Sequence, residues 1–157
     1  TQIEKRAKAI FVTSANDMYE AVMENIENQD LFICCAAVAD FRPSDINENK
    51  IKKNNLKSIS LSRNKDILAN VCQLKNKPIC IGFAAETQNL IENATEKLMN
   101  KKCDAIVLND VSSKKIGLNS NDNEVHFITL KKTEKISKNS KQIISEKLIK
   151  KIAKYFF

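Results

Sequence analysis

Three nearly uninterrupted apolar runs, separated by segments with helical periodicity, constrain the fold more than any other feature of the chain. The runs are "LFICCAAVA" from Leu31, "PICIGFAAE" from Pro78 and "CDAIVLND" from Cys103. A continuous apolar run is typical of a strand that is covered on both faces. Because helical patterns lie between the runs, the sequence predicts an α/β fold, with a parallel sheet and helices on both of its faces.

Shorter patterns predict the remaining elements. Residues 7–15, "AKAIFVTSA", read as another strand, and Ser14 or Asn16 then caps a helix that ends near Asn28. Two more helices are expected at 66–74 and 90–100. The expected inward residues of these first two helices are Met18, Ala21, Val22 and Ile26, followed by Ile67, Leu68 and Val71.

The rest of the chain predicts a protruding arm, a hairpin and a closing helix. "KIKKN" and "SISLS" are short, alternating and polar, which favours a two-stranded arm. "NEVHFITL" followed by "EKIS" predicts the hairpin. The closing helix, "NSKQIISEKLIKKIAKYFF", is expected to bury Ile143, Ile144, Leu148, Ile152 and Tyr155.

Composition narrows the class of protein. The 157 residues suit a single domain, 1–157, and a net charge of +7 admits nucleic acid, membrane surfaces or phosphorylated ligands. Nucleic acid is discounted because only 6% of residues are aromatic and only three are arginine. No apolar run is long enough to span a membrane and "TQIEKRAK" lacks a signal-peptide core, so we expect a cytoplasmic protein that does not bind membranes.

The cysteines and the histidine do not indicate a metal site. The chain has five cysteines and no CxxC pair, and Cys34 and Cys35 would point to opposite faces of a strand. We therefore expect reduced thiols that serve as small core residues, and no zinc. His126 has no evident acidic or nucleophilic partner and is interpreted as structural.

Parallel sheets bind ligands beyond the carboxyl ends of their strands. The predicted ends are Ser14, 37–40, 82–86 and 109–110, so the most unusual local sequences fall where a site should lie. A phosphate-binding loop needs several glycines after the first strand, but the chain contains only Gly82 and Gly117. A nicotinamide dinucleotide site is therefore disfavoured.

Two candidate groups lie in the first half of the chain. Asp40 follows a predicted buried strand in "ADFRP", where a carboxylate can bind a ribose hydroxyl or a base amine; a turn or cap aspartate is an equal alternative. Lys50 shares one face of an extended segment with Lys52, which suits the charge of phosphoryl transfer. A solvated edge strand protected by lysine is the alternative.

Three more candidates lie in the second half. Phe83 follows Gly82 at a strand end, where its ring can pack on a base or can simply close the core. Lys97 and Lys101 are four residues apart, so they share a helical face that can grip an anion or be merely solvated. Asn109 and Asp110 end the next strand, where a turn is the simpler interpretation.

The order of these motifs is more specific than any one of them. "AAVADFRP", "KIKK", "GFAAET", "KLMNKKCDAIVLNDVS" and "GLNSNDNEVHFI" succeed one another, and this succession resembles the bacterial phosphopantothenate–cysteine ligase of coenzyme A biosynthesis. The resemblance covers nearly the whole chain, from about Val12. It implies a Rossmann-like, homodimeric domain that joins 4′-phosphopantothenate to L-cysteine. The resemblance implies that this reaction consumes CTP in the presence of Mg²⁺, passes through an acyl-cytidylate, and releases pyrophosphate and CMP.

The resemblance also assigns roles to residues. It implies nucleotide contacts by Asp40, Lys50, Phe83, Lys97 and Lys101, with the backbone of Ala36 and Ala37 beside them. Lys50 would be catalytic, on an arm that straps over the substrate. No residue is assigned as a metal ligand.

The family's glycine-rich opening segment is not found in this sequence, nor is the flavin-dependent decarboxylase, the only part that would use FMN. We therefore expect a C-terminal part of the ligase that is weakly active alone and that takes the missing segment or the decarboxylase as a partner. The alternative is a non-catalytic nucleotide-binding or dimerisation fragment that needs a partner chain.

Overall fold

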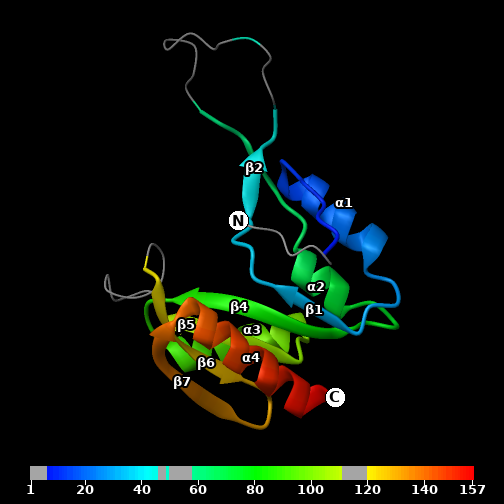
Figure 1. Ribbon diagram of the computed structural model, residues 1–157. Helices are drawn as coiled ribbons and strands as arrows, with labels where there is room; N and C mark the ends of the chain where they lie inside the picture. Colours follow the sequence, from blue (N-terminus) through cyan, green and yellow to red (C-terminus); the bar gives the residue numbers. More distant parts are fainter. Residues whose placement is uncertain (1–6, 46–48, 50–57, 111–119) are drawn as a thin grey trace. The chain divides into compact units, whose positions relative to one another are not determined.

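The computed structural model describes residues 7–45, 49, 58–110 and 120–157 (Figure 1). The chain divides into two compact units, each described here by itself. One unit comprises residues up to Asn25 together with 37–67, and the other comprises 26–36 together with 68–157. The sequence prediction of one domain stays a prediction.

The larger unit is built on a five-stranded sheet of order β1-β4-β5-β6-β7. Its strands are β1 (Leu31–Cys34), β4 (Ile79–Glu86), β5 (Ala105–Asp110), β6 (Asp122–Ile128) and β7 (Thr133–Ser140). The first three of these are parallel, with Leu31 opposite Ile79 and Ile81 opposite Ala105. β6 and β7 extend the sheet as the expected antiparallel hairpin. The predicted α/β class is confirmed.

One face of this sheet is covered by α4 (Lys141–Phe156). Alternate residues of the strands point to this face because side chains on a strand alternate between its two sides. The resulting core comprises Ile81, Ala105, Val107, Val125, Phe127 and Ile136 from the strands, with Ile144, Leu148 and Ile152 from the helix. The Ser140 hydroxyl accepts a hydrogen bond from the Ile143 amide and so caps α4.

The opposite face is covered by α2 (Ile67–Cys72) and α3 (Leu90–Lys101), so helices do lie on both faces. Gly82 allows the close approach of α2. A methyl group added there would lie 2.6 Å from Cδ2 of Leu68 and 2.7 Å from Cδ1 of Ile106. The predicted inward residues Ile67, Leu68 and Val71 are all buried, as expected.

The smaller unit contains α1 (Ala15–Asn25) and a ribbon of two short antiparallel strands, β2 (Phe41–Pro43) and β3 (Leu61–Arg63). The Ser14 hydroxyl accepts from the Asp17 amide, and the Asp17 carboxylate accepts from the Ser14 amide, so Ser14 is the cap that the sequence suggested. β3 begins within the segment "SISLS" of the predicted arm, but its partner is β2. Because "KIKKN" lies outside the described residues, the arm itself stays a prediction.

Three predictions about elements were wrong. Residues 7–12 form no strand, because none of the described strands pairs with them, and the Phe11 side chain is 88% exposed. β1 is half-buried rather than covered, since it has a sheet neighbour only on its β4 side among the described strands. In α4, Ile143 and Tyr155 are 40% and 38% exposed, since they lie at the margins of the buried face.

Candidate functional site

The side of the sheet that α4 covers opens toward the carboxyl end of β4. Ile81 is fully buried there, whereas Phe83, two residues further along the same face, is 41% exposed. Ala85 is also exposed and lies opposite Asn109 of β5 in the sheet register. The Phe83 side chain is therefore accessible near the carboxyl end of β4, which leaves its ring able to stack on a planar ligand.

Lys97 of α3 reaches the end of β4. Its Nζ lies 2.6 Å from Oε1 of Glu86, and the Glu86 side chain is only 14% exposed. Asn93 of the same helix donates to the other Glu86 oxygen at 3.4 Å and to the Gln88 carbonyl at 3.0 Å. α3 thus places an ammonium group beside the end of β4. Lys101 follows one helical turn later and is half-buried.

Asn109 is part of β5, so its interpretation as a turn residue was wrong. Its position is fixed by backbone pairing with Ala85 on one side and Val125 on the other. The amide oxygen of Asn109 is buried and accepts no hydrogen bond within the part of the chain that the structure describes. A polar acceptor thus lies inside the sheet at the strand ends.

Asp40 lies directly before β2 in the smaller unit, with an exposed side chain. Asn64 fixes the backbone around it. The Asn64 amide donates to the Asp40 carbonyl at 2.8 Å, and its Nδ2 donates to the Ala39 carbonyl at 2.8 Å. Arg42 in turn donates to Oδ1 of Asn64 at 2.9 Å. The base of the ribbon is therefore locked while the Asp40 carboxylate stays accessible.

The other predicted residues have the following positions. Ala36 and Ala37 are exposed and follow β1, Ala36 in the larger unit and Ala37 in the smaller. Lys50 lies outside the described residues. The structure brings Lys97 to the end of β4. The roles predicted for all of the site residues stay predictions.

Sequence reasoning missed two polar residues that organise these surroundings. Glu86 holds Lys97, and Asn64 holds the loop that precedes β2. Glu86 stands at a strand end in "GFAAET", which is a recognisable signal, but its partner comes from a separate helix. For Asn64 no signal was available, because its contacts join segments more than twenty residues apart.

Three cysteines gather on the side of the sheet that α2 and α3 cover. Cys72, Cys80 and Cys103 are buried, and Sγ of Cys72 lies 3.7 Å from Sγ of Cys103. The hydrogen bond with Cys103 is the main cause that raises the pKa of Cys72 to about 12, and the pKa of Cys80 is raised by its hydrogen bond with Cys72 and by burial. All three are free thiols, and no group of three or more metal-binding side chains occurs among the residues described.

A family model for the "DNA/pantothenate metabolism flavoprotein C-terminal domain" matches residues 1–156. The chain belongs to this family. The resemblance stated from its motifs is thereby confirmed at the level of the family. No described helix of this family member is long and apolar enough to cross a membrane.

Curated relatives agree with the family assignment. The Coenzyme A biosynthesis bifunctional protein CoaBC of Vibrio vulnificus (strain CMCP6) is 41% identical over 147 residues, which is 91% of this chain and 37% of that protein. The protein of the same name from Escherichia coli (strain K12) is 36% identical over 150 residues, 92% of this chain and 37% of that protein. The chain thus spans little more than a third of these relatives.

Solved structures support the fold. A crystal structure of the C-terminal domain of Coenzyme A biosynthesis bifunctional protein CoaBC superposes with a TM-score of 0.72 at 34% identity, covering 90% of this chain and 62% of that one. The DNA/pantothenate metabolism flavoprotein from Streptococcus pneumoniae gives a TM-score of 0.72 at 20% identity, with 92% and 71% coverage. The second likeness concerns the fold alone.

Proposed function

We propose that this chain performs the ligase step of coenzyme A biosynthesis, the CTP-dependent joining of 4′-phosphopantothenate to L-cysteine. The observation that carries the proposal is the family match over 1–156, together with relatives named for coenzyme A biosynthesis. The choice of CTP and of these two substrates comes from the motif resemblance. The relatives are much longer than this chain, so their full activity is part of the proposal.

The reaction has two steps. A carboxylate oxygen of 4′-phosphopantothenate attacks the α-phosphorus of CTP, the bond to the β-phosphate oxygen breaks, and pyrophosphate leaves. The amine of cysteine then attacks the acyl carbon of the acyl-cytidylate, the bond to the CMP oxygen breaks, and the amine loses a proton. Negative charge builds on phosphoryl oxygens in the first step, so positioned ammonium groups are the catalytic requirement.

The residues of the chain supply groups that suit these steps. We assign Lys50 to the charge that develops at the α-phosphate, and Asp40 with the backbone of Ala36 and Ala37 to the nucleoside. Phe83 offers a partly exposed ring beside the strand ends. Lys97 and Lys101 are assigned to the phosphates.

The ion pair of Lys97 fits this assignment. Its side chain is 48% exposed and is held by a single carboxylate, so an incoming phosphate can share the ammonium group, which has three donor hydrogens. Glu86 then orients Lys97 rather than competing for it completely. An exposed pair of this kind contributes only about 0–1 kcal/mol to stability, so rearranging it costs little.

Mg²⁺ is expected to neutralise triphosphate charge in this reaction. Because the described residues include no group of side chains suited to hold a metal, we derive no step from the ion and expect it to arrive with CTP. FMN has no part in the proposed ligation. A homodimer is likewise part of the proposal, with sedimentation velocity as its test.

The decisive experiment measures pyrophosphate release that requires both CTP and cysteine. It is run with the chain alone and with the chain joined to the preceding part of the Vibrio vulnificus relative. Turnover in the joined protein supports the ligase proposal. Saturable CTP binding without turnover in either form would instead support the non-catalytic nucleotide-binding module, and saturable NADPH binding would overturn both.

A further inference from the structure

A groove of about 380 Å³ lies between β7 and α4 and is lined mainly by lysines. Lys135 and Ser137 come from β7, while Lys147, Lys150 and Lys151 come from α4, with Ile136 completing the lining. The groove is shallow and open to solvent. This surface is separate in the sequence from every residue assigned to the ligase.

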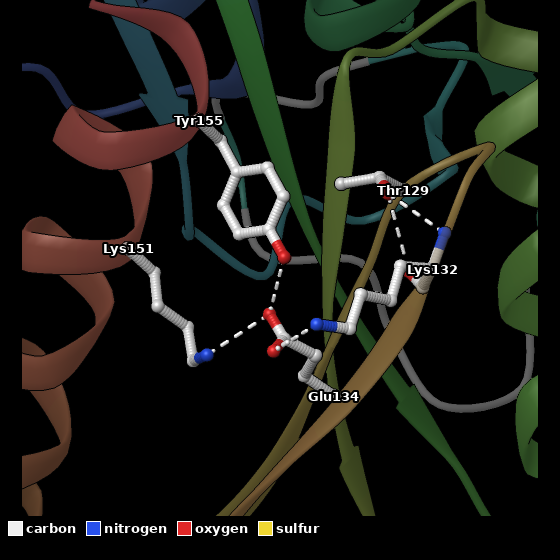
Figure 2. Close-up of polar contacts among 5 residues, drawn as sticks. All are labelled: Thr129, Lys132, Glu134, Lys151 and Tyr155. Carbon is white, nitrogen blue, oxygen red and sulfur yellow. Dashed lines mark hydrogen bonds and ion pairs between the residues drawn. The ribbon is translucent and has the colours of Figure 1, made fainter.

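The charges at one end of the groove are already balanced. Glu134 accepts hydrogen bonds from Lys151 at 2.9 Å and from the Tyr155 hydroxyl at 2.7 Å, and its other oxygen lies 2.8 Å from Nζ of Lys132 (Figure 2). Across the groove, Lys135 is paired with Glu124 at 2.8 Å. These carboxylates fix the outer lysines in place.

Lys147 and Lys150 have no such partner. Neither forms an ion pair with any carboxylate of the described residues, and Glu146, four residues before Lys150, makes no ion pair with it. Lys147 lies three residues before Lys150 and four before Lys151, so the ammonium groups share one helical face. Like charges at these spacings destabilise a helix by about 0.2–0.5 kcal/mol per pair.

Protection of an exposed sheet edge explains only part of this pattern. β7 is the outer strand of the sheet, and lysine on such a strand discourages pairing with another chain. That reason applies to Lys135, which lies on the strand. It does not apply to Lys147 and Lys150, which lie on α4. An anion that neutralises the shared face accounts for all of them.

We propose that this groove binds a small anion that carries several phosphate groups. Lys147 and Lys150 would be its main ligands, and Lys135, Lys151 and the Ser137 hydroxyl would line its position. Ammonium groups bind phosphate as point charges, without the fixed geometry that arginine imposes. The site is therefore expected to select ligands by their charge and not by their shape.

The test is a titration of the full chain with tripolyphosphate, followed by two-dimensional ¹H–¹⁵N NMR. Saturable shifts at 135–138 and 147–151 are expected, in addition to any shifts that binding at the proposed ligase site causes in α3. The double variant Lys147→Gln with Lys150→Gln should weaken the affinity at least about tenfold, since two charge-assisted contacts are lost. The matched control, Lys75→Gln with Lys141→Gln, removes the same charge from exposed positions outside the groove and should change the affinity less than twofold. Circular dichroism melts establish that both variants are folded.

Several results would overturn the proposal. One is the absence of saturable shifts in the groove, and another is equal weakening by the control, which would indicate non-specific attraction to a basic surface. Shifts confined to the ends of β4 and to α3 would mean that tripolyphosphate binds only at the proposed ligase site. ATP and CMP test whether the phosphate chain can come from a nucleotide. Tighter binding of a short single-stranded oligonucleotide than of tripolyphosphate would indicate that the groove binds nucleic acid and not a small anion.

Discussion

At the scale of single residues, the effect of removing the ammonium group of Lys97 distinguishes a phosphate ligand of the proposed ligase from a lysine on a solvated surface. A charge-assisted contact to a phosphate contributes about 1.5–3 kcal/mol, so Lys97→Gln should weaken CTP binding by an amount in that range. Isothermal titration calorimetry measures it, with Lys75→Gln as the exposed control. A loss of CTP affinity of less than twofold would indicate that Lys97 only lies on a solvated helix face. Lys101→Gln is expected to behave in the same way.

Lys50 has a different predicted signature, because its proposed role lies mainly in the transition state and only to a small extent in binding CTP. Lys50→Gln should abolish acyl-cytidylate formation in the joined, active protein and affect CTP affinity only mildly. Rapid quench of the first turnover measures the intermediate directly. An unchanged first-turnover rate would remove Lys50 from the mechanism, whatever its effect on binding.

The cysteines should differ in reactivity according to their surroundings. The raised pKa values of Cys72 and Cys80 keep those thiols protonated at neutral pH, and Cys103 is buried. Because the thiolate is the nucleophile, we expect iodoacetamide to modify exposed Cys35 long before these three. Peptide mass spectrometry over time measures the order. Equal rates for Cys35 and Cys72 in the folded chain would contradict it, and urea should make the rates converge.

At the scale of elements, the packing of α2 on β4 depends on the absence of a side chain at Gly82. In Gly82→Ala the new methyl group would meet the tips of Leu68 and Ile106, which are themselves buried. Because those side chains have little room to move, we expect destabilisation of about 1–3 kcal/mol. Urea unfolding measures it. Stability equal to that of the parent chain would show that α2 can shift. Ala85→Gly, three residues along the strand at an exposed position, controls for the effect of glycine on the backbone entropy.

The ribbon illustrates how polar side chains can hold a short element. β2 and β3 pair over only three residues each, which is too little to be stable by itself. Asn64 holds the end where Phe41 pairs with Arg63, through the Ala39 carbonyl and the Arg42 side chain, and the hydroxyls of Ser44 and Ser62 are hydrogen-bonded at 2.7 Å toward the other end. The exposed ring of Phe41 also lies under the Arg63 guanidinium, 5.6 Å from its centroid.

At the scale of the whole molecule, stability should fall in acid. Hydrogen bonds from Lys132, Tyr155 and Lys151 lower the pKa of Glu134 to about 2, below its ordinary value of 4.5. The unfolded chain therefore binds the proton more readily than the folded chain. The stabilisation is complete above about pH 4.5 and is lost as the pH falls toward 2. The pKa of Asp17 is lowered by the Ser14 amide and that of Glu124 by Lys135, so both act in the same direction.

The measurement is urea unfolding at a series of pH values across that window. Glu134→Gln should flatten the pH dependence, because a neutral amide does not titrate. Glu146→Gln, which removes an exposed carboxylate of α4 outside this cluster, is the matched control and should leave the slope as it is in the parent chain. A Glu134→Gln profile as steep as that of the parent would show that the contacts in Figure 2 are not maintained in solution.

The fold was largely predictable because buried strands and helices require characteristic patterns of apolar residues in the sequence. "PICIGFAAE" and "CDAIVLND" were expected as buried strands and form β4 and β5. The same reasoning failed for residues 7–15. Their apolar pattern is typical of a strand, but they do not pair with any of the described strands. A strand exists only where a neighbouring backbone accepts its hydrogen bonds, and composition does not record that neighbour.

The site was predictable in its residue types but not in its connections. The spacing of Lys97 and Lys101 placed both on one face of a predicted helix, and α3 carries them as expected. The sequence did not indicate that Lys97 pairs with Glu86 or that Asn64 binds the Ala39 carbonyl. It also did not indicate that four lysines of β7 and α4 line one groove. Local periodicity determines which face of an element a residue occupies. Only tertiary packing decides which faces meet, because it joins residues that the chain keeps far apart.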